Sequence, residues 1–192
     1  EEEFVGKGVS YCATCDGPLY RDKTIAVVGG GDAALEEAIF LTKFAARIYL
    51  IHRRDEFRGA KILVDRLAEN EKVEFVLNSR PEAIEGGDFV ERISLSDTVT
   101  GEQRILPVDG VFIFVGVEPN SDFIRGVVDL DEGGFVITDG EMLTSRVGIY
   151  AAGDIRSGNV RQVAAAVGEG TVAAMGVRDR IRTLEGSSYA IS

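Results

Sequence analysis

The only two cysteines of this 192-residue chain stand three positions apart, directly before an acid, in Cys12-Ala-Thr-Cys15-Asp16. A structural zinc ion takes about four ligands, and the sequence offers two sulfurs and one distant histidine, so we predict no metal site. The spacing instead favours a redox pair whose two sulfurs can form a disulfide and whose reactive form is a thiolate. Two inert structural thiols are the alternative. Asp16 could give or take a proton, or could simply solvate the turn.

A run of three glycines, Gly29-Gly30-Gly31, follows a β-branched stretch and precedes a helical pattern. In Gly29-x-Gly31-x-x-Ala34 the first glycine permits the turn, the second lets a pyrophosphate approach, and the small third residue allows helix–strand packing. The N-terminus of the following helix adds N–H donors and a positive dipole end. The pattern predicts a dinucleotide site, with Asp32 as the helix N-cap. A glycine-rich turn without a ligand is the alternative.

A basic cluster, His52-Arg53-Arg54 and Arg58, follows the second predicted strand. An NAD-binding fold carries an acid at about this place, on the ribose hydroxyls. Here residues 47–61 hold five basic and two acidic residues, a net +3 in a chain of net −11. Because arginine can bind a phosphate through two hydrogen bonds, the cluster predicts NADPH rather than NADH. A solvated basic loop is the alternative. We expect His52, the only histidine, to stack or hydrogen-bond near the nucleotide rather than to act as an acid or base.

The elements that would position these residues alternate between strand and helix. Apolar runs predict strands at residues 24–28, 48–51, 73–77 and 111–115, and helical spacing predicts helices from Asp32 and over residues 60–67. Such alternation is typical of a parallel sheet. After about residue 80, strands at 89–96 and 104–108 flank Thr100-Gly101 and predict a β-hairpin or meander.

A turn at residues 116–120 marks a predicted domain boundary, giving domains of residues 1–116 and 117–192. Beyond it we predict short strands at 135–138 and 148–152 and a long helix from about 162 to 182. A second glycine pattern, Gly168-x-Gly170-x-x-Ala173, falls inside this helix rather than after a strand, so we do not expect it to bind a nucleotide. The apolar stripe of the helix is rich in small residues: Val163, Ala166, Val167, Gly170, Ala174, Val177 and Ile181.

Composition narrows the class of protein. Hydrophobic residues make up 45% and charged residues 28%, which is ordinary globular composition. The net charge of −11 argues against nucleic acid binding. The longest apolar runs fall far short of the roughly 20 residues of a membrane span, so we expect no membrane association. The chain opens on three glutamates, without a methionine or a signal peptide. We therefore expect a cytoplasmic protein and a sequence that belongs to a longer chain.

Taken in order, the motifs resemble those of bacterial-type, low-molecular-weight thioredoxin reductases over essentially the whole chain. They are Cys12-Ala-Thr-Cys15-Asp16-Gly, the Gly29–Ala34 turn, the HRR-x-x-x-R pattern at 52–58, Ala152-Gly153-Asp154 and Arg161-Gln162. The flavoprotein subunit of alkyl hydroperoxide reductase and dithiol oxidases are similar and stay open as alternatives. A non-catalytic NADP(H)-binding fragment is a further alternative.

The resemblance implies an α/β fold: a Rossmann-like NADPH-binding domain, made of a parallel sheet and a β-meander, followed by the second half of a split FAD-binding domain. Electrons would pass from NADPH through FAD to the Cys12–Cys15 disulfide and on to thioredoxin or a similar dithiol protein, in a homodimer. Cys15 would then be the sulfur on the flavin side, Cys12 the one that attacks thioredoxin, and Asp16 the group that manages the proton. Further cofactor contacts are expected at Ala33, Glu36, Gly116, Gly153, Asp154, Arg161, Gln162, Val163 and Ala164.

Two features depart from that family. Its first half, with its own FAD glycine loop, is not in this sequence, so we expect the chain by itself to bind NADPH and to hold little or no FAD. Asp32 stands where family members often carry Asn or Ser. An acid beside a pyrophosphate is unfavourable unless it caps the helix.

Overall fold

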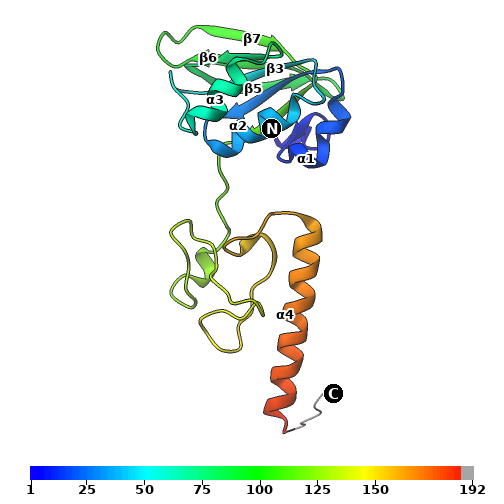
Figure 1. Ribbon diagram of the computed structural model, residues 1–192, viewed down its shortest axis with the longest axis vertical. Coiled ribbons are helices and arrows are strands. Elements are labelled where there is room, and N and C mark those ends of the chain that lie inside the picture. Colours follow the sequence, from blue (N-terminus) through cyan, green and yellow to red (C-terminus); the bar gives the residue numbers. More distant parts are fainter. Residues whose placement is uncertain (187–192) are drawn as a thin grey trace. The chain divides into compact units, whose positions relative to one another are not determined.

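The computed structural model describes residues 1–186 and divides the chain into two compact parts, residues 1–116 (unit 1) and 117–192 (unit 2). Each unit is described by itself below (Figure 1). Among the helices of residues 1–186, none combines the length and the apolar character that crossing a bilayer requires.

Unit 1 is built on a five-stranded parallel sheet in the order β1-β8-β2-β3-β4. Its strands are β1 (Val9–Ser10), β2 (Thr24–Gly29), β3 (Arg47–Ile51), β4 (Val73–Val76) and β8 (Gly110–Phe114). The helices α2 (Asp32–Leu41) and α3 (Lys61–Ala68) connect parallel strands. The parallel sheet expected from the strand–helix alternation is therefore confirmed.

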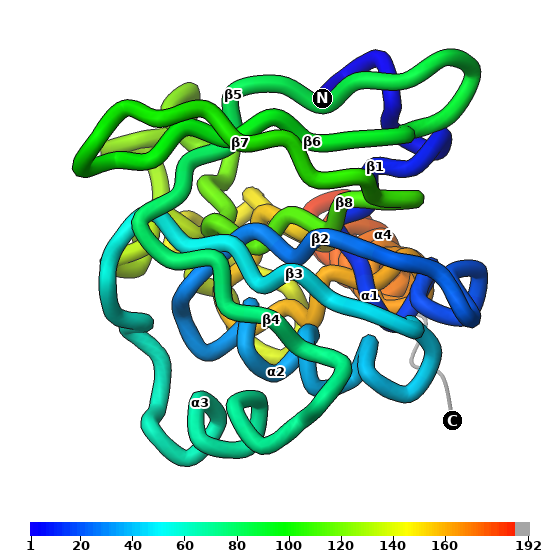
Figure 2. The backbone as a smooth tube through the Cα atoms, turned by 90° about the horizontal axis from the view of Figure 1, so that it is seen from above, coloured from blue at the N-terminus to red at the C-terminus, as the bar shows by residue number. Residues whose placement is uncertain are grey.

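Strand β2 shows why the sheet is buried on both faces. Ile25 and Val27 join a core with the helices, whereas Ala26 and Val28 join a second core on the opposite face. That second core includes residues of an antiparallel sheet ordered β5-β6-β7. The helices and this smaller sheet thus cover opposite faces of the parallel sheet (Figure 2). Strands buried on both faces read as continuous apolar runs, which explains why these strands could be predicted.

The meander strands are β5 (Ser79–Gly86), β6 (Val90–Asp97) and β7 (Gln103–Pro107). The hairpin of β6 and β7 was predicted, but β5 was not. Strand β5 is an edge strand, contains Pro81, and shifts register twice against β6. A proline and bulges at a sheet edge disturb the alternation on which a strand prediction depends.

Three short elements near the N-terminus were also not predicted. They are the 3-10 helix η1 (Glu2–Phe4), the two-residue strand β1, and helix α1 (Ala13–Asp16), which continues into η2 (Gly17–Tyr20). Each is too short to show a period. The prediction that Asp32 is the N-cap of α2 is wrong, because Gly31 is the N-cap and Asp32 is the first helical residue.

Unit 2 contains η3 (Asp122–Ile124), η4 (Gly153–Ile155) and α4 (Val163–Leu184). The long helix is confirmed, and the second glycine pattern lies inside it. The prediction of strands at 135–138 and 148–152 is wrong, because the only β-structure within residues 117–186 consists of isolated bridges. Val136, for example, exchanges hydrogen bonds with the loop at residues 155–157, so no ladder extends from it.

Candidate active site

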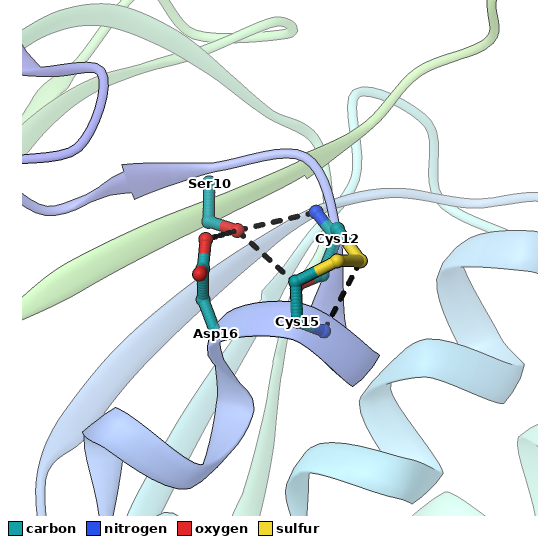
Figure 3. Close-up of a disulfide and its surroundings, with 4 residues drawn as sticks. All are labelled: Ser10, Cys12, Cys15 and Asp16. Atoms are coloured by element: carbon teal, nitrogen blue, oxygen red, sulfur yellow. Dashed lines mark hydrogen bonds between the residues drawn. A yellow bond between two sulfur atoms is a disulfide. The ribbon is translucent and has the colours of Figure 1, made fainter. Parts of the chain in front are cut away.

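The two cysteines form a disulfide at the start of α1 (Figure 3). Cys12 is the N-cap of this short helix, and the backbone N–H of Cys15 donates to the sulfur of Cys12 at 3.1 Å. Cys12 is half-buried and Cys15 is exposed within the described residues. The predicted disulfide therefore forms within four consecutive residues, because one turn of helix brings the sulfurs of Cys12 and Cys15 together.

A serine that the sequence analysis did not predict connects the disulfide to Asp16. Ser10 is buried at the end of β1, and its hydroxyl donates to Asp16 Oδ2 at 2.7 Å while accepting from the Cys12 N–H at 3.1 Å (Figure 3). The same hydroxyl lies 3.3 Å from the Cys12 carbonyl oxygen. Since β1 has only two residues, its register with β8, where Ser10 pairs with Phe112, is what fixes this hydroxyl. No signal in the sequence marked it.

The glycine turn lies between β2 and α2 and is packed as the nucleotide motif requires. A Cβ at Gly29 would lie 2.5 Å from the Cβ of Ala34, and one at Gly30 would lie 2.2 Å from His52 Nδ1. A Cβ at Gly31 would meet no atom within 4 Å. The first two glycines are therefore required by close packing, while the space over Gly31 is open to a ligand.

The cavity at this turn has a volume of about 270 Å³. It is lined by Gly29 and Gly30, by the predicted residues His52, Arg53 and Arg58, and by Arg80, which was not predicted. Arg54 is not among the lining residues. Arg80 is the second residue of β5 and comes four positions after β4 ends, near the carboxyl edge of the parallel sheet, where α/β sheets bind ligands; that position is the one signal that could have found it.

The charge at this cavity comes from arginine. Within residues 1–186, the guanidinium groups of Arg53, Arg54 and Arg58 take part in no salt bridge, so their charge is not neutralised by a carboxylate. Burial, together with the charges of Arg58, Arg54 and Arg53, lowers the pKa of His52. His52 is 6% exposed and stacks on Phe57 at 5.5 Å between ring centres. It therefore acts as a neutral wall of the cavity, which suits an anionic ligand bound by the arginines.

The other predicted residues of unit 1 lie close to the turn or the sheet edge. Ala33 and Glu36 are exposed in the first turns of α2, and Gly116 follows β8 with φ +116° and open space around it. The carboxylate of Asp32 accepts a 2.7 Å hydrogen bond from the backbone N–H of Ala60. Asp32 therefore caps a chain segment other than its own helix.

In unit 2, Glu169 of α4 holds the Gly153–Asp154 turn. Its carboxylate accepts from the Gly153 N–H at 2.8 Å and pairs with Arg156, which also donates to Thr138. Burial acts to raise the pKa of Glu169, but the hydrogen bond from the Gly153 N–H and the charge of Arg156 lower it overall. Glu169 is a further residue that the motif reading missed. Its charge network fixes the turn against α4 and leaves Asp154 exposed.

The start of α4 carries the remaining predicted residues. Arg161, Gln162, Val163 and Ala164 are exposed there. Arg161 adopts φ +52°, its N–H donates to Asn159 Oδ1 at 2.5 Å, and its guanidinium lies over the Phe135 ring at 4.7 Å. A non-glycine residue at positive φ is strained and persists where its surroundings hold it. In unit 2, Asp154 and the N-terminus of α4 are thus exposed, whereas Gly153 is buried against α4, where a Cβ added to it would lie 3.4 Å from the Cβ of Ala166.

Comparison with known proteins gives consistent matches. Residues 1–170 match the family model of pyridine nucleotide-disulphide oxidoreductases. The chain is 49% identical over 176 residues to the thioredoxin reductase of Mycolicibacterium smegmatis, covering 91% of this chain and 57% of that protein. It is 44% identical to the thioredoxin reductase of Listeria monocytogenes, covering 99% and 60%. The crystal structure of thioredoxin reductase from Streptococcus pyogenes superposes with a TM-score of 0.89 at 43% identity, covering 95% and 60%.

These matches extend over most of this chain but over only 57–60% of the relatives' own length. They include both units, since the alignment with the L. monocytogenes protein covers 191 residues.

Proposed function

Because the chain belongs to the pyridine nucleotide-disulphide oxidoreductase family, we propose that it works as an NADPH-dependent thioredoxin-disulfide reductase. The observation that carries this proposal is the Cys12–Cys15 disulfide, hydrogen-bonded through Ser10 to Asp16, in the same unit as a glycine-turn cavity lined by arginines. In this proposal residues 1–116 form the NADPH-binding domain and residues 117–192 the C-terminal segment of an FAD-binding domain.

The cysteines carry the exchange of electrons with the partner protein. Two electrons and two protons convert the disulfide to two thiols. The N–H of Cys15 donates to the Cys12 sulfur and would stabilise a thiolate there. That thiolate attacks the partner's disulfide and forms a mixed disulfide. Cys15 then attacks the Cys12 sulfur, which restores the Cys12–Cys15 disulfide and releases the partner as a dithiol.

In this proposal Asp16 handles the proton of the thiol–disulfide exchange. It is adjacent to Cys15 and bonded to Ser10. A serine hydroxyl both donates and accepts, so Ser10 can donate to the ionised carboxylate. When Asp16 is protonated, Ser10 can accept from it and turn its own proton to the Cys12 carbonyl at 3.3 Å. The carboxyl group is thus hydrogen-bonded in both of its protonation states.

NADPH is the cofactor that fits the glycine-turn cavity. The open space over Gly31 and the N-terminus of α2 suit the pyrophosphate. Arg53 and Arg58, with Arg54 beside them, suit the 2′-phosphate, because arginine binds phosphate through two parallel N–H donors. Ala33, Glu36 and Gly116 border this site.

FAD is the second cofactor of the proposal, and when bound it supplies the two-electron relay between NADPH and the disulfide. The exposed side chain of Asp154 and the exposed N-terminus of α4 fit its polar and phosphate groups, since both present groups that the described chain does not cover. Asp154 would hold the ribityl–phosphate region. Arg161, Gln162, Val163 and Ala164 would border the ring. Glu169 keeps the turn in place.

The partner in this proposal is thioredoxin or a similar dithiol protein. The protein works as a homodimer in the cytoplasm, without nucleic acid or membrane. The thioredoxin partner, the homodimer and the cytoplasmic location rest on the resemblance to thioredoxin reductases, whereas the exclusion of nucleic acid and membrane rests on the net charge of −11 and on the short apolar runs of the sequence.

The proposal is tested with NADPH and the complete, flavin-loaded enzyme that contains this chain, offered oxidised thioredoxin, an oxidised peroxiredoxin-type protein, or molecular oxygen. We expect NADPH oxidation with thioredoxin, lost in Cys12→Ser and in Cys15→Ser but kept in the control Thr14→Ala. Cys12→Ser leaves no trapped partner, whereas Cys15→Ser traps a mixed disulfide through Cys12. If turnover is faster with the peroxiredoxin-type protein or with oxygen alone, the assignment of thioredoxin as the substrate is wrong.

A further inference from the structure

Residues 52–60, which we call the basic loop, are fixed to the glycine turn by three consecutive backbone N–H groups. Those of Arg58 and Gly59 both donate to the Gly30 carbonyl, at 2.7 and 3.1 Å, and that of Ala60 donates to the Asp32 carboxylate at 2.7 Å. Two of the three hydrogen bonds therefore end on a backbone oxygen, and the third ends on a side chain that mutation can remove.

The loop lies directly against the first turn of α2. A Cβ at Gly59 would lie 2.5 Å from Leu35 Cδ1 and 3.0 Å from the Asp32 nitrogen. The other end of the loop is held separately, since Thr98 donates to the Arg53 carbonyl at 3.1 Å and the Asn78 N–H donates to the Arg54 carbonyl at 3.0 Å. Both ends are anchored while the arginine side chains of the loop remain exposed.

We propose that Asp32 is a positioning residue for selectivity towards the 2′-phosphate: its carboxylate fixes the Arg58 end of the basic loop and is not itself a ligand of the nucleotide. This inference rests on the proposed use of NADPH. A carboxylate beside the pyrophosphate would repel it, but here the charge faces a backbone N–H and the positive end of α2. The Asp32 carboxylate then affects binding of the 2′-phosphate indirectly, by fixing the position of Arg58.

Two substitutions separate the hydrogen bond from the charge. Asp32→Asn and Asp32→Ala both remove the negative charge, but only the asparagine keeps a side-chain oxygen that can accept from the Ala60 N–H. Any effect of charge on the two phosphate groups of the pyrophosphate is therefore common to both variants. An effect of the hydrogen bond appears only in the alanine.

The experiment measures the dissociation constants of NADPH and NADH by calorimetry and amide hydrogen exchange at residues 58–60. For Asp32→Ala we expect the NADPH preference to fall by about three- to tenfold, the effect of losing one capping hydrogen bond, with faster exchange at Ala60. For Asp32→Asn we expect the preference and the exchange to stay close to those of the parent. As a control, Asp55→Ala removes an exposed acid of the same loop and does not lower the preference.

The outcomes are distinguishable. If Asp32→Ala keeps the full preference, or if Asp32→Asn lowers it equally, the positioning role is wrong. A double variant of Arg53 and Arg54 tests the underlying function. If the double variant also keeps the full preference for NADPH over NADH, the proposed contact of these arginines with the 2′-phosphate is wrong. If the double variant lowers that preference and Asp32→Ala does not, only the positioning role of Asp32 is wrong.

Discussion

The two units hold their side chains in different ways. Both clusters of buried apolar residues in the described part of the chain belong to unit 1, where strands such as β2 are buried on both faces. In unit 2 the principal element is α4, a 22-residue helix with no buried residue. Within residues 1–186 several of its apolar side chains are exposed, such as Val167 at 65% and Leu184 at 72%.

The contacts that keep each candidate site in place therefore differ between the two units. The cysteine pair and the arginine cavity of unit 1 stand on elements that a core fixes. The Gly153–Asp154 turn of unit 2 depends instead on hydrogen bonds and one ion pair, from Glu169 to Gly153 and to Arg156. Apolar burial is non-directional and cumulative, whereas a polar network depends on each of its members. Substitutions in the two units should therefore differ in size and in kind.

The largest effect is expected from the apolar core. Leu50→Ala in β3 removes a fully buried side chain and should lower the free energy of unfolding by about 2–5 kcal/mol. Leu184→Ala, the same change at the exposed end of α4, should stay within about 0.5 kcal/mol. Urea denaturation followed by circular dichroism measures both. Equal losses would contradict the contrast between the units, because Leu184 would then have to be covered.

A second test concerns ligand binding by unit 1. Arg53→Ala should weaken NADPH by roughly tenfold or more, because a hydrogen bond to a charged group contributes about 1.5–3 kcal/mol, and should change NADH much less. Arg54→Ala should have a smaller effect, since Arg54 does not line the cavity. Arg125→Ala in unit 2 is the matched control, removing an exposed arginine elsewhere. Calorimetry measures all three, and an equal loss of NADPH and NADH would show that Arg53 does not contact the 2′-phosphate.

The contrast also explains what the sequence could predict. Central strands were predicted because burial on both faces leaves an unbroken apolar run, as at Thr24–Val28. The strands predicted at 135–138 and 148–152 failed because an apolar run specifies burial but not a partner strand. Around Val136 the hydrogen bonds go to a loop instead.

The residues of the candidate site also fall into those that the sequence could predict and those that it could not. The cysteines, the glycines and the arginines were found because their chemistry requires particular residue types at short spacing. Ser10 and Glu169 were not found because only the fold brings them to their partners. Ser10 bonds Asp16, six positions away, and Glu169 bonds the Gly153 N–H, sixteen positions away. Asp32 was noticed as a capping residue, but its partner, Ala60, lies on another segment 28 positions away.

A third prediction tests a polar contact inside unit 1. Ser10→Ala removes the hydroxyl that bonds Asp16 and should slow disulfide reduction in the holoenzyme by about two- to tenfold, the equivalent of one hydrogen bond. Ser94→Ala is the control, since Ser94 also donates to a carboxylate, that of Glu85, outside the site. Stopped-flow absorbance follows the step, and an unchanged rate in Ser10→Ala would remove Ser10 from the proton handling.

The smallest effect is a dependence of unit 1's stability on pH through His52. Its pKa is lowered in the folded state, by burial first and then by Arg58, Arg54 and Arg53. Above the ordinary value of 6.5 the imidazole is neutral in both folded and unfolded chains, so it contributes nothing to the pH dependence there. As the pH falls below 6.5, the unfolded chain binds a proton that the folded chain resists, and the free energy of unfolding should decrease.

His52 is the only histidine, and the carboxylates with a lowered pKa, such as Glu82 and Glu85, titrate below their ordinary value of 4.5. Burial raises the pKa of Glu37, but this group would increase the free energy of unfolding as the pH falls, which is opposite to the effect of His52. Urea denaturation between about pH 5 and 7.5 should show a decline in the parent that is absent in His52→Gln, whose amide does not titrate. Hydrogen exchange should place the loss of protection in β2 and β3 and leave α4 unchanged, since unit 2 contains no histidine. A decline that persists in His52→Gln, or one equally large in α4, would mean that another group controls it and that the two units do not respond separately.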